Sequence, residues 1–184
     1  MIETERLILH RWRATDLEPY AAMMADPQVT DWLGGGQTRP QAEAMIGQLD
    51  VEFDRRGYGI LVFERKADGA FLGSGGLWSV GEEIPFAPAV EIGWRLARNA
   101  WGQGYATEAA TALLEDGFGR VGLPEIVAFT AQINRRSRLV MERLGMSRDP
   151  TRDFEHPRLP EGHPLRSHVV YVAKSPQPAS DLRP

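Results

Sequence analysis

The chain of 184 residues contains no cysteine. Disulfide bonds, thiolate catalysis and cysteine-ligated metal sites are therefore excluded. An excess of positive charge is also missing, because 21 Lys and Arg residues stand against 25 Asp and Glu residues, and the formal net charge is -4. Proteins that bind nucleic acid directly are usually basic. The charge balance therefore argues against nucleic acid as a direct ligand.

Long apolar runs are absent as well. No stretch approaches the roughly 20 consecutive apolar residues that a helix needs to cross a bilayer. Residues 1–6 are acidic and lack the apolar core of a secretory signal peptide. These absences predict a cytoplasmic protein without a membrane partner. The rest of the composition, 42% hydrophobic and 25% charged, is that of an ordinary globular protein, and the length suits one domain.

Turn signals and hydrophobic periodicity predict the secondary structure. Thr38 and Gln41 form a capping-box pattern ahead of apolar residues at helical spacing, which predicts a helix over residues 39–56 that Gly57 ends. The dipeptide Asp68-Gly69 between two apolar segments predicts a β-hairpin. The other predicted elements are a strand at 6–12, a helix opened by a capping box at 15–18, strands at 58–66, 71–78 and 89–96, a helix at 104–117, a strand at 125–131, a helix at 134–144, and a strand pair at 146–154 and 167–173.

The step from strand 89–96 through helix 104–117 to strand 125–131 predicts a parallel pair with a right-handed crossover. Together with the hairpin, this predicts an α/β (α+β) fold with a mixed, mostly antiparallel sheet and helices on both faces. No repeat or linker divides the chain, so we expect one domain over residues 1–174. The polar, proline-containing segment 175–184 is expected to be a disordered tail.

The most informative segment is residues 101–109, Trp-Gly-Gln-Gly-Tyr-Ala-Thr-Glu-Ala, a glycine-containing turn between a strand and a helix. Glycines let the backbone approach a ligand, and the first N–H groups of a helix point at an anion. The turn therefore predicts a phosphate-bearing cofactor. A dinucleotide site would place such a turn near the first strand and an acidic residue after the next one, which ends here in Thr130-Ala131-Gln132. A nucleoside-triphosphate loop would need Gly-Lys-Ser/Thr, but Tyr105 follows Gly104.

Two further segments frame this turn: Val-Glu-Ile-Gly-Trp at 90–94 before it, and Asn-Arg-Arg-Ser at 134–137 with Glu-Arg-Leu-Gly-Met at 142–146 after it. With the order of elements, they resemble the GNAT superfamily of acyl-CoA-dependent N-acetyltransferases, in particular the Rim-type branch, which includes ribosomal-protein N-terminal acetyltransferases. The resemblance covers roughly residues 4–174. It implies a splayed parallel strand pair, acetyl-CoA as the acyl donor and no metal. One departure is Asn99, where the family usually has Gln or Arg.

The resemblance also implies how acetyl-CoA is held. The pantetheine arm would pair with the backbone near Trp94 and Leu96, as an added strand does. Asn134 would hydrogen-bond the arm, and Ser137 would donate to the arm or to the departing thiolate. The pyrophosphate would contact the backbone amides of Trp101, Gly102, Gln103, Gly104, Tyr105, Ala106 and Thr107.

Amine attack on a thioester needs a neutral amine, and hence a general base. Glu91, on the strand that the resemblance places beside the thioester, is the first candidate, with Glu82 and Glu83 as alternatives. The backbone N–H near Trp94 would stabilise the oxyanion.

The general acid is open, because the tyrosine that many family members carry seven residues after the asparagine is replaced here by Met141. Ser137, Tyr105, water or an unprotonated thiolate remains, and we favour Ser137.

Structural alternatives exist for these assignments. Glu91 also fits a solvated strand residue, or an ion pair with Arg95 or Arg98, and Asn134 also fits a helix N-cap. The metal alternative is weak, because His156, His163 and His168 match no zinc spacing.

The function predicted from the sequence is acetyl transfer from acetyl-CoA to a primary amine, either a protein N-terminus or a small molecule. The alternative is a non-catalytic acyl-CoA-binding module. The acceptor's identity and the choice between monomer and homodimer stay open.

Overall fold

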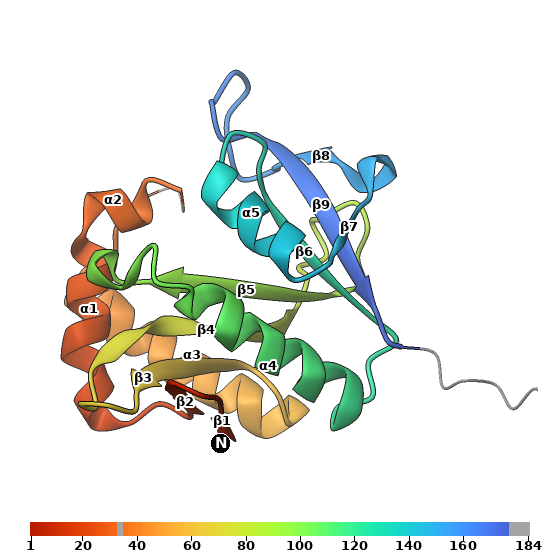
Figure 1. Cartoon of the computed structure of the whole chain (residues 1–184). Coiled ribbons are helices and arrows are strands. Elements are labelled where there is room, and N and C mark those ends of the chain that lie inside the picture. The colour runs from red at the N-terminus through yellow and green to blue at the C-terminus, as the bar shows by residue number, and fades with distance from the viewer. Residues whose placement is uncertain (33–34, 177–184) are drawn as a thin grey trace, which may run out of the picture.

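The computed structural model describes residues 1–32 and 35–176. The tail predicted from residue 175 therefore lies, from residue 177 on, outside the described residues. Within them, nine strands form one sheet in the order β1-β2-β3-β4-β5-β6-β9-β7, and β8 also pairs with β9 (Figure 1). The strands are β1 (Ile2–Glu3), β2 (Leu7–His10), β3 (Ile60–Arg65), β4 (Phe71–Ser79), β5 (Val90–Leu96), β6 (Glu125–Ala131), β7 (Ser147–Arg148), β8 (Phe154–Glu155) and β9 (Ser167–Lys174).

Helices cover both faces of this sheet, with α4 in front of it and α1 and α3 behind it in the view of Figure 1. None of the helices in the described residues is both long and apolar enough to cross a membrane. The helices are α1 (Leu17–Ala25), α2 (Pro27–Thr30), α3 (Arg39–Arg56), α4 (Tyr105–Gly119) and α5 (Arg135–Arg143), with single 3₁₀ turns η1 (Ala14–Asp16), η2 (Arg98–Ala100) and η3 (Pro150–Arg152).

The local signals at the ends of α3 are confirmed. The Thr38 N–H donates to Gln41 Oε1 at 2.8 Å, and Gly57 ends the helix with φ of 74°. The capping box predicted at residues 15–18 is wrong. The shorter Asp16 side chain reaches back to accept from the Arg13 N–H at 2.7 Å, so a 3₁₀ turn forms before α1 begins.

The predicted fold class is confirmed: the neighbouring strands pair antiparallel except for β5 and β6, which are parallel. That parallel pairing has a single register pair, Glu91 with Val127. Beyond it the two strands separate, as the splayed pair requires. The strand predicted over 146–154 is instead divided into β7, η3 and β8, because Pro150 cannot donate to a sheet ladder.

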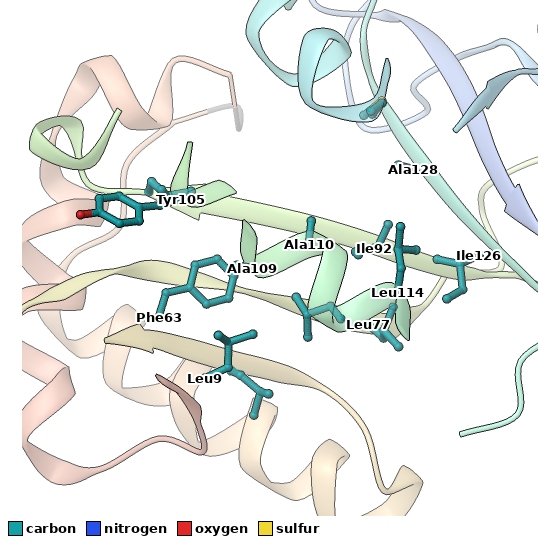
Figure 2. Close-up of a cluster of buried hydrophobic side chains, with 14 of the residues drawn as sticks. Leu9, Phe63, Leu77, Ile92, Tyr105, Ala109, Ala110, Leu114, Ile126 and Ala128 are labelled. Carbon is teal, nitrogen blue, oxygen red and sulfur yellow. The ribbon is translucent and has the colours of Figure 1, made fainter. Parts of the chain in front are cut away.

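The core between α4 and the sheet fixes where that helix begins. Ala109 and Ala110 are fully buried and lie against Leu77, Ile92 and Ile126 (Figure 2). Small side chains on the buried face let the helix lie close to the strands. The amino end of α4 is thereby held at the carboxyl end of β5.

Candidate active site

A cavity of about 920 Å³ opens where β5 and β6 separate. The Ala89 carbonyl accepts from Val80 and the Ala97 N–H donates to Leu72, both at 2.9 Å, so the odd-numbered residues of β5 direct their backbone groups toward β4. The backbone groups of the even-numbered residues, Trp94 and Leu96 among them, point toward the separated β6. One of these groups is already used, since the Leu96 carbonyl accepts from the Trp101 indole at 2.8 Å.

The glycine turn lies at one wall of the cavity. Gly102 and Gly104 have φ of 74° and 84°, in the left-handed region that favours glycine, and α4 begins at the next residue. Six of the seven residues predicted to contact pyrophosphate line the cavity, and Gln103 does not. The side-chain amide of Gln103 donates to the Asn99 carbonyl at 2.7 Å. The turn can therefore present backbone N–H groups to an anion.

Thr4 and Arg6, which are distant in sequence from the glycine turn, support it. The Glu108 carboxylate, in the first turns of α4, accepts from Thr4 Oγ1 at 2.5 Å, from the Arg6 backbone N–H at 2.8 Å and from Arg6 Nε at 2.6 Å. Arg6 in turn donates to the Gln103 carbonyl at 3.0 Å and lies over the Tyr105 ring at 4.5 Å. Sequence reasoning missed this support, because about a hundred residues separate its members.

We predict that Glu108→Gln lowers the free energy of unfolding at neutral pH by about 1–2 kcal/mol, since a charge-assisted network is lost at a partly exposed site. Burial raises the pKa of Glu108, but hydrogen bonds from Thr4 and Arg6 outweigh it, so the pKa is lowered. A lowered pKa stabilises the fold above the unfolded value of about 4.3, and the effect is lost as the pH falls. Melting curves of the two proteins should therefore converge in acid. A gap that does not change with pH would contradict the account.

Glu91 is the only predicted catalytic carboxylate that is buried, with 8% of its surface exposed. Burial raises its pKa well above the usual range, although the charge of Arg95 and a hydrogen bond with Trp78 oppose the shift. The solvated alternative is therefore wrong. In the described chain Glu91 forms no ion pair, and Arg98 pairs with Asp26 at 3.6 Å instead. A carboxylate with a raised pKa is a stronger base than an ordinary one.

The alternative bases are placed less well. Glu83 lines the cavity and forms an ion pair with Arg158, and a hydrogen bond to backbone and then the Arg158 side chain lower its pKa. Glu82 does not line the cavity.

Gly93 explains how Trp78 reaches the neighbourhood of Glu91. Glu91 and Trp78 are register partners on β5 and β4, and Gly93 follows two residues along the same face. A Cβ at Gly93 would lie 2.4 Å from the Trp78 ring. Only glycine leaves room for the indole there. A glycine within a strand of β-branched and aromatic residues was visible in the sequence, but the sequence did not show that Trp78 packs against it.

The first turn of α5 forms the opposite wall. Asn134 caps the helix, accepting from the Ser137 N–H at 3.3 Å, and its amide donates to Thr130 Oγ1 at 3.0 Å. The N-cap interpretation is thereby confirmed, and both Asn134 and Ser137 line the cavity. Arg136 lies 4.5 Å above the Trp101 ring and so connects this helix to the glycine turn. Met141 is buried at 2% exposure in the core.

An aromatic cluster that sequence reasoning missed lies beside the far end of the cavity. Its successive rings stack edge-on or tilted, with centroids 4.9 to 6.1 Å apart. Burial lowers the pKa of both of its histidines, which favours neutral rings. In the described segments no three potential ligands converge on a metal position. The members of the cluster are Phe86, Phe129, Phe154, His156 and His168.

Comparison with known proteins gives one consistent result. The family model "Acetyltransferase (GNAT) domain" matches residues 6–147. An uncharacterized N-acetyltransferase p20 from Bacillus licheniformis is 30% identical, over 83% of this chain and 85% of its own. The crystal structure of an acetyltransferase from Agrobacterium tumefaciens is 30% identical, with a TM-score of 0.74 over 94% of this chain and 92% of that one. A ribosomal-protein-S5-alanine acetyltransferase from Vibrio fischeri shares the fold at 18% identity, with a TM-score of 0.74 over 99% and 98%.

Proposed function

The chain belongs to the GNAT family of acetyltransferases and is an acetyl-CoA-dependent acyltransferase, and from that premise we propose that it transfers the acetyl group directly to a primary amine. The acceptor is a small-molecule amine or a protein N-terminus. The observation that carries the proposal is the position of Glu91, a buried carboxyl with a raised pKa at the point where β5 and β6 separate.

The residues that line the cavity offer hydrogen-bonding groups to the diphosphate and to the pantetheine arm of acetyl-CoA. The diphosphate would accept from the N–H groups of the glycine turn and the first turn of α4. The pantetheine arm would run between the separated strands and pair with the Trp94 carbonyl and the Leu96 N–H, which point away from β4. The side-chain amide of Asn134 has two hydrogens, and one of them is donated to Thr130 Oγ1. The other would be available to donate to the arm.

In the reaction, the amine nitrogen attacks the thioester carbonyl, a C–N bond forms, and the carbonyl oxygen becomes an oxyanion. The Trp94 N–H stabilises that oxyanion. The ionised form of Glu91 accepts the proton that the nitrogen loses, directly or through water, so the rate should rise as the pH rises through the raised pKa of this carboxyl. The C–S bond then breaks, and the Ser137 hydroxyl donates to the departing thiolate, since Met141 has no proton to give. Ser137 lines the cavity, and its backbone N–H is used by the cap.

The experiment that tests the proposal is an amine screen that follows release of the CoA thiol, with mass spectrometry of the acetylated products. Turnover with at least one primary amine, and none without an amine, is the expected result. If acetyl-CoA binds but no small amine or peptide N-terminus is acetylated, the chain is the non-catalytic acyl-CoA-binding module instead. The fold shared with the Vibrio fischeri enzyme is the reason to include peptides in the screen.

A further inference from the structure

Arg95 is a charged residue of the cavity that the mechanism above does not use. It is half-buried and lines the same cavity as Glu91. In the described part of the chain no carboxylate forms an ion pair with it, whereas the neighbouring Arg98 pairs with Asp26. A half-buried guanidinium without an anionic partner is costly unless a ligand supplies one.

Two buried residues that carry hydroxyl groups lie near Arg95. Tyr20, with 1% of its surface exposed, lies close enough to Arg95 for the guanidinium charge to oppose the burial that raises the pKa of Tyr20. Ser74 is the register partner of Arg95 on β4 and is also buried. The protein itself therefore places two hydroxyls near this guanidinium, and no carboxylate of the described residues forms an ion pair with it.

The phosphates of acetyl-CoA do not suit Arg95, because it lies on the other face of the sheet from α4. The neighbours of Arg95 along β5, Trp94 and Leu96, pack in the core under α4. Successive side chains of a strand point to opposite faces. Arg95 therefore shares its face with Tyr20 of α1, away from the glycine turn.

The strand surface between Glu91 and Arg95 carries no side chain of its own, and the Trp78 ring lies over it. The two residues stand four positions apart on one face of β5, about 13 Å between their Cα atoms, and the Arg95 guanidinium is close enough to act on the pKa of the Glu91 carboxyl. The residue between them on that face is Gly93, whose register partner is Gly76, so no side chain fills the strand surface there except the overlying Trp78 ring. A small molecule that contacts both ends needs an amine at one end and an anion at the other.

We propose that the acceptor carries a carboxylate close to its primary amine, and that Arg95 binds this carboxylate while the amine lies at Glu91. The acceptor class is thus an amino acid or a similar small amino-carboxylate. A guanidinium holds a carboxylate through two parallel hydrogen bonds, and the Tyr20 and Ser74 hydroxyls lie within the same polar group. This inference rests on the proposed acetyl transfer, and it selects one acceptor class for the same site.

The test compares matched acceptors that differ only in the carboxylate: amino acids, their carboxamides and their decarboxylated amines. Phenylalanine, phenylalaninamide and phenethylamine are one such set. For the preferred side chain we expect kcat/KM for the free acid to exceed both analogues by about tenfold or more. In Arg95→Met the free acid should lose about 100-fold and the decarboxylated amine less than about threefold, with Arg95→Lys between wild type and Arg95→Met.

Arg98→Met is the control, since it removes an adjacent guanidinium that already has a carboxylate partner. It should leave the preference for the free acid unchanged. Equal rates with the acid and its decarboxylated amine, or equal losses for both in Arg95→Met, would overturn the inference while leaving acetyl transfer intact. If Arg95→Met does not fold, the inference is tested by the rates of the wild type with the three acceptors and by the same rates for Arg95→Lys.

A binding measurement separates this inference from the proposed function. Trp32 and Trp78 line the cavity, so tryptophan fluorescence can follow the titration of amino acids and their N-acetyl derivatives into the CoA-loaded protein. Carboxylate-dependent binding that Arg95→Met abolishes would support the inference even if no amine is acetylated. Binding that ignores the carboxylate, or no binding of any amino acid, would overturn it.

Discussion

Glu91→Gln should lower kcat by about 10²- to 10⁴-fold, the usual contribution of a positioned general base. The amide keeps the size of the side chain but cannot accept a proton. Because Glu91 faces away from α4 and the glycine turn, the dissociation constant of acetyl-CoA should stay within about threefold of wild type. Steady-state kinetics with a productive amine, together with an acetyl-CoA titration, checks both parts.

Glu83→Gln is the matched control, since Glu83 is the other carboxylate on the cavity wall and its charge is already paired with Arg158. It should retain most of the activity. The reverse pattern, with Glu91→Gln active and Glu83→Gln inactive, would move the base to Glu83.

The same substitution has a pH signature in stability. The folded-state pKa of Glu91 lies above the unfolded value of about 4.3, because burial disfavours the carboxylate. A raised pKa stabilises the fold below the unfolded value, and that contribution is lost as the pH rises through the folded value. Wild type should therefore lose stability relative to Glu91→Gln as the pH increases. Parallel melting curves across this range would show that the pKa of Glu91 is not raised in the folded protein.

Gly102→Ala should weaken acetyl-CoA binding by about 10- to 100-fold, equivalent to one or two charge-assisted hydrogen bonds. Its φ of 74° is strained for alanine, so the backbone N–H groups of the turn would shift, and the new methyl group would stand where the diphosphate approaches.

Gly122→Ala is a close control. Gly122 has φ of 75°, and a Cβ at either glycine would meet no atom within 4 Å, so both substitutions should cost similar stability. Gly122 lies outside the cavity, in the connection between α4 and β6. Acetyl-CoA titrations of both variants at a temperature where each is folded make the comparison. Equal losses of affinity in the two variants, or no loss in either, would show that the diphosphate of acetyl-CoA does not bind at this turn.

Elements with local signals at both ends were predictable. Helix α3 has the predicted bounds because a capping box starts it and Gly57 ends it. The Asn134 cap and the left-handed Gly145 likewise bound α5. The two short elements β1 and α2 were missed, since a few residues carry too little periodicity to stand out.

The candidate site was predictable as a set of residues but not as an environment. The glycines pointed to the turn, and the resemblance to the GNAT superfamily pointed to Glu91. The pKa of Glu91 depends on its burial in the folded protein, and the support of the turn depends on contacts between Glu108 and Arg6, which are remote in sequence. The role of Arg95 follows from which face of β5 it occupies and from its lack of an acidic partner in the described chain. Both are properties of the assembled sheet.

The most direct test of the central claim, that the cavity between β5 and β6 is an acyl-CoA site, is the melting temperature of dialysed protein with acetyl-CoA, CoA, NAD or ATP. A ligand at about one hundred times its dissociation constant stabilises the folded state by about 2.7 kcal/mol. For a chain of this size that is a rise of roughly 5–10 °C. We predict this rise with acetyl-CoA and CoA alone. A rise with NAD or ATP, and none with either CoA compound, would contradict the account.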